Sequence, residues 1–143
     1  MLKNLDPLLV PRLLYHLAAM GHGDEIAVVD RNYPAHSAGP QVVDLAGVDV
    51  TTAIGAVLSV LPLDTFVDEP VLYMEPVTGE GRLPVHQEVV DLASAVEGRA
   101  ISAAGLSRAD FYRRAREARV VVATAEDRPY ACFVLVKGVI AAT

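Results

Sequence analysis

Apolar residues recur along this chain in two rhythms that alternate from one segment to the next. Apolar positions three or four residues apart are typical of helices, whereas short unbroken runs of Val, Ile and Leu are typical of buried strands. The first rhythm predicts helices over residues 10–21, 51–62, 83–96 and 107–118. The second predicts strands over residues 25–30, 41–47, 70–77, 100–106, 120–125 and 131–141.

Residues typical of helix ends and the order of the segments define the expected architecture. Pro11 suits the first turn of a helix and Gly21 suits its end. Because helices alternate with strands, we expect a single α/β domain over residues 1–143, with a central, mostly parallel sheet flanked by helices. The pattern leaves open whether the last two strands pair with each other. His16 and His86 fall in predicted helices, where we expect them at the surface.

The composition bounds the class of protein. Hydrophobic residues make up 52% of the 143 residues but aromatic residues only 6%, so the surplus is aliphatic and fits a subunit interface or a well-filled core. No apolar run reaches the roughly 18 residues of a membrane helix, so no membrane contact is expected. The formal net charge of −6 argues against nucleic acid as a partner.

The chain has one cysteine, Cys132. One thiol excludes an intrachain disulfide and any cysteine-rich metal site. The N-terminal stretch is a poor signal peptide, and together with the single thiol this favours a cytoplasmic protein. Cys132 itself is expected to be either a small buried hydrophobic residue or a reactive thiol.

One segment, MGHGDEIAVVDRNYPAHS over residues 20–37, gathers much of the polar chemistry around a short apolar run. In α/β sheets, ligands collect beyond the carboxyl ends of the strands, which is where Asp30 falls. His22 stands at the other end of the same strand, up to about 25 Å away along extended backbone. A single site that uses both residues must fold this segment back or combine neighbouring subunits.

The two leading candidates each have a plain structural alternative. An imidazole titrates near neutrality, so His22 suits proton transfer, but it also suits the C-terminal end of the preceding helix, whose dipole favours positive charge. Asp30 suits the orientation of a substrate hydroxyl, but it also suits a turn in which it accepts hydrogen bonds from the backbone of Asn32 or Tyr33.

Other motifs give weaker signals. His36 and Ser37 are two members of a hydrolytic triad, but no nucleophile elbow accompanies them. GHG does not extend to a dinucleotide fingerprint and no Walker-type loop occurs, so no cofactor is expected. A metal site is conceivable from four side chains, those of His22, Asp24, Asp30 and His36. Their spacing matches no dedicated metal-binding motif, so no metal is expected.

The sequence resembles a known family almost from end to end. The segments that carry the resemblance are MGHGDEIAVVDRNYPAHS, LLVPRLLYHLAAMGHGDEI, SRADFYRRA and the terminal RPYACFVLVKGV. In this order, in a chain of this length, they resemble the fucose mutarotase and ribose pyranase (RbsD/FucU) family. The pieces GDE and PAHS are closer to the fucose mutarotase branch.

The resemblance implies an RbsD-like fold and a homodecamer whose site lies at a subunit boundary. The family's proton-donor histidine falls on His22 and its substrate-binding aspartate on Asp30. Further substrate contacts fall on Arg108, Tyr130, Ala131 and Cys132. The chain departs from the family at Cys132, where Asn is usual, and this bears on sugar preference because a thiol is a weak donor and acceptor.

The expected function is mutarotation, a cofactor-independent isomerisation. The anomers of free L-fucose or a related sugar would interconvert by ring opening, with His22 as general acid and base. One alternative within the same fold is a D-ribose pyranase. Another is a monosaccharide-binding or transport-associated protein without catalysis. A metal-dependent hydrolase is a further alternative, which sensitivity to a chelator would distinguish.

Overall fold

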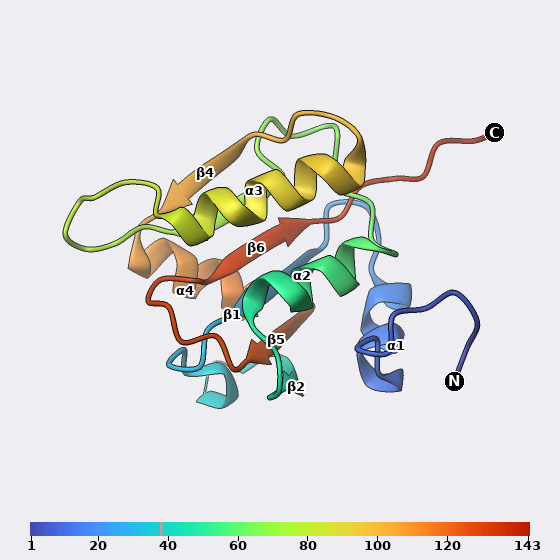
Figure 1. Cartoon of the computed structure of the whole chain (residues 1–143), viewed down its shortest axis with the longest axis horizontal. Coiled ribbons are helices and arrows are strands. Elements are labelled where there is room, and N and C mark those ends of the chain that lie inside the picture. Colours follow the sequence, from blue (N-terminus) through green and yellow to red (C-terminus); the bar gives the residue numbers. More distant parts are fainter. Residues whose placement is uncertain (38) are drawn as a thin grey trace.

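The computed structural model describes residues 1–37 and 39–143 (Figure 1). The helices are α1 (Pro11–Ala19), α2 (Val50–Leu58), α3 (Pro84–Glu97) and α4 (Arg108–Glu117), with a short 3₁₀ helix, η1 (Ala35–Ser37). The strands are β1 (Glu25–Val29), β2 (Gln41–Leu45), β3 (Val71–Met74), β4 (Ala103–Leu106), β5 (Val120–Thr124) and β6 (Phe133–Val136). Each α-helix and strand lies within a segment that the apolar rhythm predicts, apart from small shifts at the ends.

The six strands form one mostly parallel sheet in the order β2-β5-β1-β6-β3-β4. β5 pairs in parallel with β1 on one side and with β2 on the other, and β3 pairs in parallel with β4. β6 runs antiparallel to both of its neighbours, β1 and β3. The last two strands therefore lie on either side of β1 and do not pair with each other. Because β6 is reversed, the loop that leads into it lies at the same edge as the carboxyl ends of β1 and β3.

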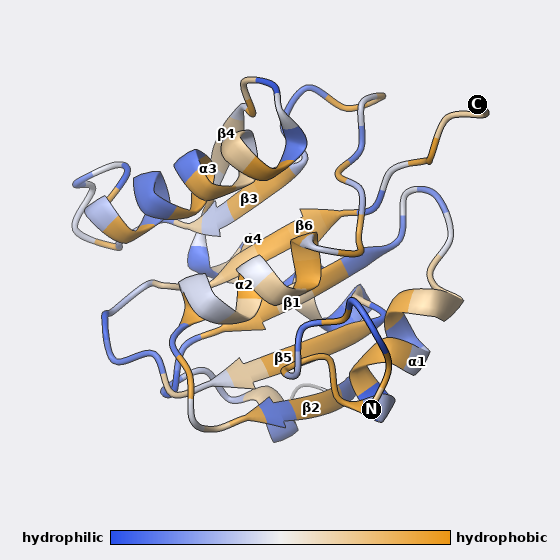
Figure 2. Ribbon diagram, turned by 45° about the vertical axis from the view of Figure 1, so that its right-hand side comes forward, coloured by the Kyte–Doolittle hydropathy of each residue, from blue (hydrophilic) through white to orange (hydrophobic). Residues whose placement is uncertain are grey.

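Helices cover both faces of the sheet (Figure 1). One core cluster joins Leu13 of α1, Ile54 of α2 and Val89 of α3 to the strands. The other cluster joins Phe111 of α4 to alternate residues of the same strands, including Ala27. Hydrophobic colour is concentrated on the strands in Figure 2, in keeping with a sheet buried on both faces.

Two sequence-based expectations are wrong. The predicted strand over residues 131–141 is shorter in the structure, from Phe133 to Val136. Beyond it, Lys137 forms only an isolated bridge with Leu63, and a Cβ on Gly138 would lie 2.6 Å from the carbonyl oxygen of Leu63. His16 and His86 are buried rather than exposed. Across residues 1–37 and 39–143, none of the helices has the length and apolarity needed to cross a membrane.

Candidate functional site

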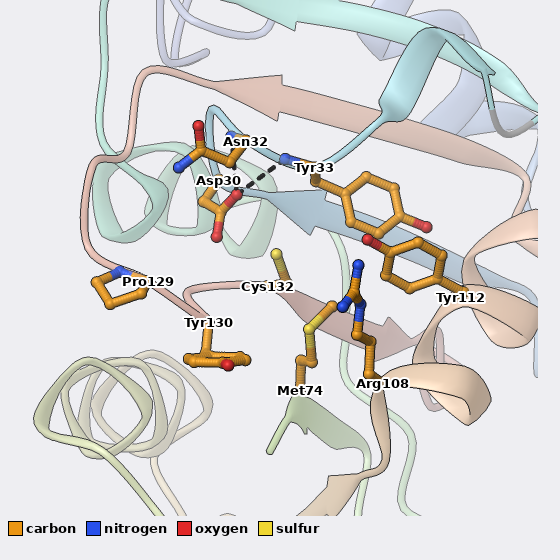
Figure 3. A pocket seen from close by; sticks show the side chains of 9 residues that line it. All are labelled: Asp30, Asn32, Tyr33, Met74, Arg108, Tyr112, Pro129, Tyr130 and Cys132. Atoms are coloured by element: carbon orange, nitrogen blue, oxygen red, sulfur yellow. Dashed lines mark hydrogen bonds between the residues drawn. The ribbon is translucent and has the colours of Figure 1, made fainter. Parts of the chain in front are cut away.

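A cavity of about 270 Å³ opens at the edge of the sheet where β1 and β3 end and β6 begins (Figure 3). Four of the residues predicted for the site line it: Asp30, Arg108, Tyr130 and Cys132. Five more complete its wall: Asn32, Tyr33, Met74, Tyr112 and Pro129. Ala131 lies between two lining residues but is fully buried in the core on the other face of the sheet.

Asp30 shows both of the features that the sequence left open. Its Oδ1 accepts hydrogen bonds from the backbone N–H groups of Asn32 and Tyr33, each at 3.0 Å, so the side chain shapes the turn after β1. Its second carboxylate oxygen takes no part in these two bonds and points toward the open space beside Pro129 and Tyr130 (Figure 3). The turn therefore fixes a negative charge at the cavity wall.

Arg108 brings a positive charge to the same cavity. It is the first residue of α4, whose start is capped by Ser107, since the Asp110 backbone N–H donates to the Ser107 hydroxyl at 3.1 Å. The guanidinium carbon lies 5.4 Å from the centre of the Tyr112 ring, one helical turn on. Tyr112 points its hydroxyl toward the guanidinium in Figure 3, so the N-terminal end of α4 presents two hydrogen-bonding groups to the cavity.

A buried histidine holds Tyr130 in place. The Leu83 backbone N–H donates to His86 Nδ1 at 2.9 Å, so Nε2 carries the proton and donates to the Tyr130 carbonyl oxygen at 2.8 Å. The imidazole also stacks on Tyr73, with ring centres 4.3 Å apart. Burial lowers the pKa of His86, and Arg82 adds to this effect, while the bond to Tyr130 opposes it. The net direction keeps the ring neutral.

A second anchor holds the loop between β5 and β6. The buried carboxylate of Glu126 accepts hydrogen bonds from Arg128 Nε and Nη2, both at 2.9 Å, and from the Val50 backbone N–H at the start of α2 at 3.2 Å. The bonds from Arg128 outweigh burial and lower the pKa of Glu126 to about 2. Arg128 also pairs with Glu88 of α3 at 2.7 Å. The residues that precede Tyr130 are therefore tied to both helices.

Cys132 supports the expectation of a small buried residue. It is 1% exposed, and burial, followed by the nearby charge of Asp30, raises the pKa of its thiol well above the ordinary value. A protonated thiol is a poor nucleophile, so the cavity does not present an activated cysteine. Burial likewise raises the pKa of Tyr33 to about 12, with smaller effects from Cys132 and Tyr112.

His22 lies at the opposite edge of the sheet. Its Nε2 is 2.9 Å from Oδ1 of Asp64, and its ring centre is 4.9 Å from that of Phe66. Because β1 runs extended between His22 and Asp30, the segment does not fold back, and the two residues stay up to about 25 Å apart. One copy of the chain thus brings together the binding residues and leaves the predicted proton donor elsewhere.

The other polar candidates lie apart from the cavity. His36 is exposed and pairs with Asp44 at 3.0 Å, and neither residue lines the cavity. In the part of the chain that the structure describes, no three His, Cys, Asp or Glu side chains come together as a metal site. The conceivable set of His22, Asp24, Asp30 and His36 is therefore not assembled by the fold.

Tyr33, Met74 and Tyr112 were not singled out from the sequence. Met74 ends a parallel strand, and Tyr112 lies four residues after Arg108 and so shares its helix face. Both relationships are visible in the sequence once the elements are placed. Tyr33 follows Asp30 by three residues, and the turn made by Asp30 brings it to the wall.

Comparison with known proteins identifies the family of this chain. Residues 3–140 match the RbsD / FucU transport protein family. The human fucose mutarotase is 41% identical, with 98% of this chain and 95% of the relative covered, and the L-fucose mutarotase of Haemophilus influenzae is 36% identical, with 97% of each covered. The crystal structure of the Streptococcus pneumoniae fucose mutarotase in complex with L-fucose is 33% identical, with a TM-score of 0.90 over 98% of this chain and 100% of that one. This chain belongs to the RbsD/FucU family.

Proposed function

We propose that this chain is a cytoplasmic, cofactor-independent mutarotase that interconverts the anomers of L-fucose or a closely related free sugar. The observation that carries the proposal is the cavity at the edge of the sheet. It combines a fixed carboxylate from Asp30, a guanidinium from Arg108 and an aromatic side chain from Tyr130. Charged groups bind sugar hydroxyls strongly, and an aromatic face packs against the C–H side of a sugar ring. Relatives named fucose mutarotase match over nearly the full length.

The reaction needs only two proton transfers. A proton is delivered to the ring oxygen as the bond between this oxygen and the anomeric carbon breaks. The anomeric hydroxyl loses its proton as the carbonyl forms. Rotation about the bond between the first two carbons presents the other carbonyl face, and closure reverses both transfers. No atom is oxidised or reduced, and no covalent bond to the protein forms.

We assign the proton delivery to His22, which takes the proton back on closure. A placed general acid–base group of this kind contributes ~10²–10⁴-fold to the rate. The second carboxylate oxygen of Asp30, which takes no part in the turn, is assigned to the hydroxyls at the anomeric end of the sugar. Arg108, Tyr130 and the backbone around Ala131 and Cys132 are assigned to the remaining hydroxyls and the ring.

The site is completed by a second copy of the chain. His22 and Asp30 lie at opposite ends of an extended strand, so His22 reaches the cavity of a neighbouring subunit rather than its own. His22 is 43% exposed, and the neighbouring side chains of Phe66 and Val67 are also exposed, as an interface residue would be in an isolated copy. We propose a homodecamer, the assembly that the resemblance implies.

Exchange NMR on a panel of free sugars tests the function. L-fucose, D-ribose, D-galactose and L-rhamnose are compared for the rate of anomer exchange with and without the protein. We expect the largest acceleration with L-fucose. Acceleration confined to pyranose–furanose exchange in ribose would select the pyranase, and binding without acceleration would select a non-catalytic sugar-binding protein. Native mass spectrometry tests the decamer separately.

A variant tests the assignment of the proton donor. His22→Ala is expected to fall to within a few-fold of the uncatalysed exchange rate, while its circular dichroism and oligomeric mass stay unchanged. His36→Ala, at an exposed histidine outside the cavity, is the matched control and is expected to exchange sugar at the wild-type rate. Wild-type exchange by His22→Ala would remove His22 from the mechanism.

A further inference from the structure

The end of β6 brings His22 next to a carboxylate 42 residues away in the sequence. The Lys137 carbonyl accepts a hydrogen bond from the Gly23 N–H at 2.8 Å, and Lys137 also forms an antiparallel bridge with Leu63. The segment after β6 is therefore held between the loop that carries His22 and the turn that carries Asp64. Gly138 allows this close approach, because a Cβ there would lie 2.7 Å from the Asp64 Cα.

Asp64 and His22 differ sharply in exposure. Asp64 is 2% exposed, while the His22 side chain is 43% exposed. A buried carboxylate is costly unless hydrogen bonds and opposite charge compensate it. Its Oδ1 accepts the Phe66 backbone N–H at 3.2 Å and lies 2.9 Å from His22 Nε2, while the guanidinium of Arg99 donates to its backbone carbonyl at 3.1 Å. Burial alone would raise the pKa of Asp64, but the Phe66 N–H and His22 lower it overall.

The pairing decides which nitrogen of His22 is available to a ligand. An ionised carboxylate only accepts hydrogen bonds, so Nε2 of His22 carries a proton and donates it to Asp64. Nδ1 is then the nitrogen left to exchange a proton with another molecule. Phe66, whose ring centre lies 4.9 Å from that of the imidazole, restricts the plane of the ring. The exposed His22 thus has a fixed tautomer and a fixed orientation.

We infer that Asp64 is the positioning residue for His22: it holds Nε2 so that Nδ1 faces the sugar in the neighbouring subunit. The inference rests on the proposed role of His22. A second pair of the same type, His36 with Asp44, provides an internal contrast. That pair has a similar distance of 3.0 Å but is exposed on both sides, at 67% and 57%, so solvent screens its charges.

Two substitutions at Asp64 separate its charge from its hydrogen bond. Asp64→Asn keeps an oxygen that the Phe66 N–H still holds, so the ring orientation is retained while the charge is lost. We expect the alkaline side of its pH–rate profile to move to lower pH, because His22 delivers a proton from Nδ1 only as the imidazolium and this cation loses the carboxylate beside it. Asp64→Ala loses the orientation as well, and we expect kcat to fall by at least about tenfold with KM little changed, a part of the ~10²–10⁴-fold that general acid–base catalysis contributes.

The matched control is Asp44→Asn, which removes a carboxylate from the exposed pair and is expected to leave both kcat and the pH–rate profile unchanged. If both Asp64 variants keep the wild-type kcat and profile while His22→Ala loses exchange, the inference is overturned and the role of His22 stands. If His22→Ala also exchanges at the wild-type rate, the assigned role of His22 and this inference fall together. Should Asp64→Ala not fold, the profile of Asp64→Asn decides alone, and an unchanged profile overturns the inference.

Discussion

His86 donates a hydrogen bond to the carbonyl oxygen of Tyr130 at 2.8 Å and thereby joins the first turn of α3 to the wall of the cavity. Tyr130 has a φ of 59°, in the left-handed region that residues other than glycine seldom adopt. Such a conformation costs on the order of 1–3 kcal/mol and persists only where the surroundings enforce it. His86 on one side and the Glu126–Arg128 pair on the other supply that enforcement.

Replacement of His86 by Phe tests this anchor. The ring volume is nearly kept, but the Tyr130 carbonyl and the Leu83 N–H both lose their partner. A buried group left without a partner costs about 1–3 kcal/mol, or about 2–6 kcal/mol for two. Because both groups are only partly buried, we expect urea denaturation to show a loss in the lower part of this range, about 2–4 kcal/mol. KM for the sugar should rise more than kcat falls, because Tyr130 is assigned to binding. Val96→Ala, at an exposed position of the same helix, is the control and should change neither value.

The same histidine predicts how stability depends on pH. Burial lowers the pKa of His86 below the ordinary 6.5, so between these two values the unfolded chain binds a proton that the native chain does not. The contribution of neutral His86 to the free energy of unfolding is therefore complete above about pH 6.5. It is lost as the pH falls through the lowered pKa of His86 in the native chain. His16 has a lowered pKa for the same leading reason, burial, and acts in the same direction.

Urea denaturation of wild type and His86→Phe on both sides of pH 6.5 measures this effect. The free energy of unfolding of the wild type should decrease toward acid, and the decrease should be shallower in the variant because one of the two histidines has been removed. Equal decreases in both proteins would contradict the prediction, since His86 would then titrate alike in the native and unfolded chains.

Arg128→Ala tests the second anchor of the Tyr130 loop. The substitution leaves the buried carboxylate of Glu126 with two donors, the backbone N–H groups of Val50 and of residue 128. A buried charge without an opposite charge beside it is strongly destabilising. Because Arg128 is itself 40% exposed, we expect a loss of about 1–3 kcal/mol rather than the full value for a buried pair. Arg113→Ala, from an exposed pair with Asp110, is the control and should lie within about 0.5 kcal/mol of wild type. Equal losses of unfolding free energy in the two variants would show that the Glu126–Arg128 pair contributes no more to stability than a surface ion pair.

The apolar rhythm was sufficient to place the helices and strands, because each of them buries a regular face against the sheet. Asp30 is predicted from its position at the carboxyl end of a strand, where α/β sheets collect ligands, whereas Arg108 is predicted only by the resemblance to the family. The apolar pattern could not show that β6 stops at Val136, because Val139 and Ile140 continue the apolar run although the chain there lies outside the sheet.

Long-range partners explain what the sequence did not reveal at the site. His86 lies between the apolar residues Val85 and Val89, so the stripe indicates a buried face, but its partner Tyr130 is 44 residues away. Asp64 follows no motif at all and meets His22 only through the segment after β6. A histidine in the apolar stripe of a predicted helix is a signal that could have corrected the expectation of a surface position for His86.

Cys132→Asn tests the departure of this chain from the family pattern. The thiol lines the cavity beside Asp30, and an Asn side chain there would add two donors and one acceptor within reach of a bound sugar. A net hydrogen bond contributes about 0.5–1.5 kcal/mol, so we expect KM for L-fucose to fall by roughly 2- to 10-fold. Cys132→Ala, which adds no polar group, is the control and should keep the wild-type KM.

Stability measurements on this variant separate sugar binding from packing. Residue 132 is 1% exposed, so an amide without partners would cost free energy in the empty protein, and a bound sugar that satisfies it would return that loss. We therefore expect Cys132→Asn to melt at a lower temperature than wild type without sugar and to gain more than wild type when L-fucose is added. An unchanged KM for every sugar, with no extra gain on addition of L-fucose, would mean that the backbone at residues 130–132, rather than the side chain at 132, makes the contact.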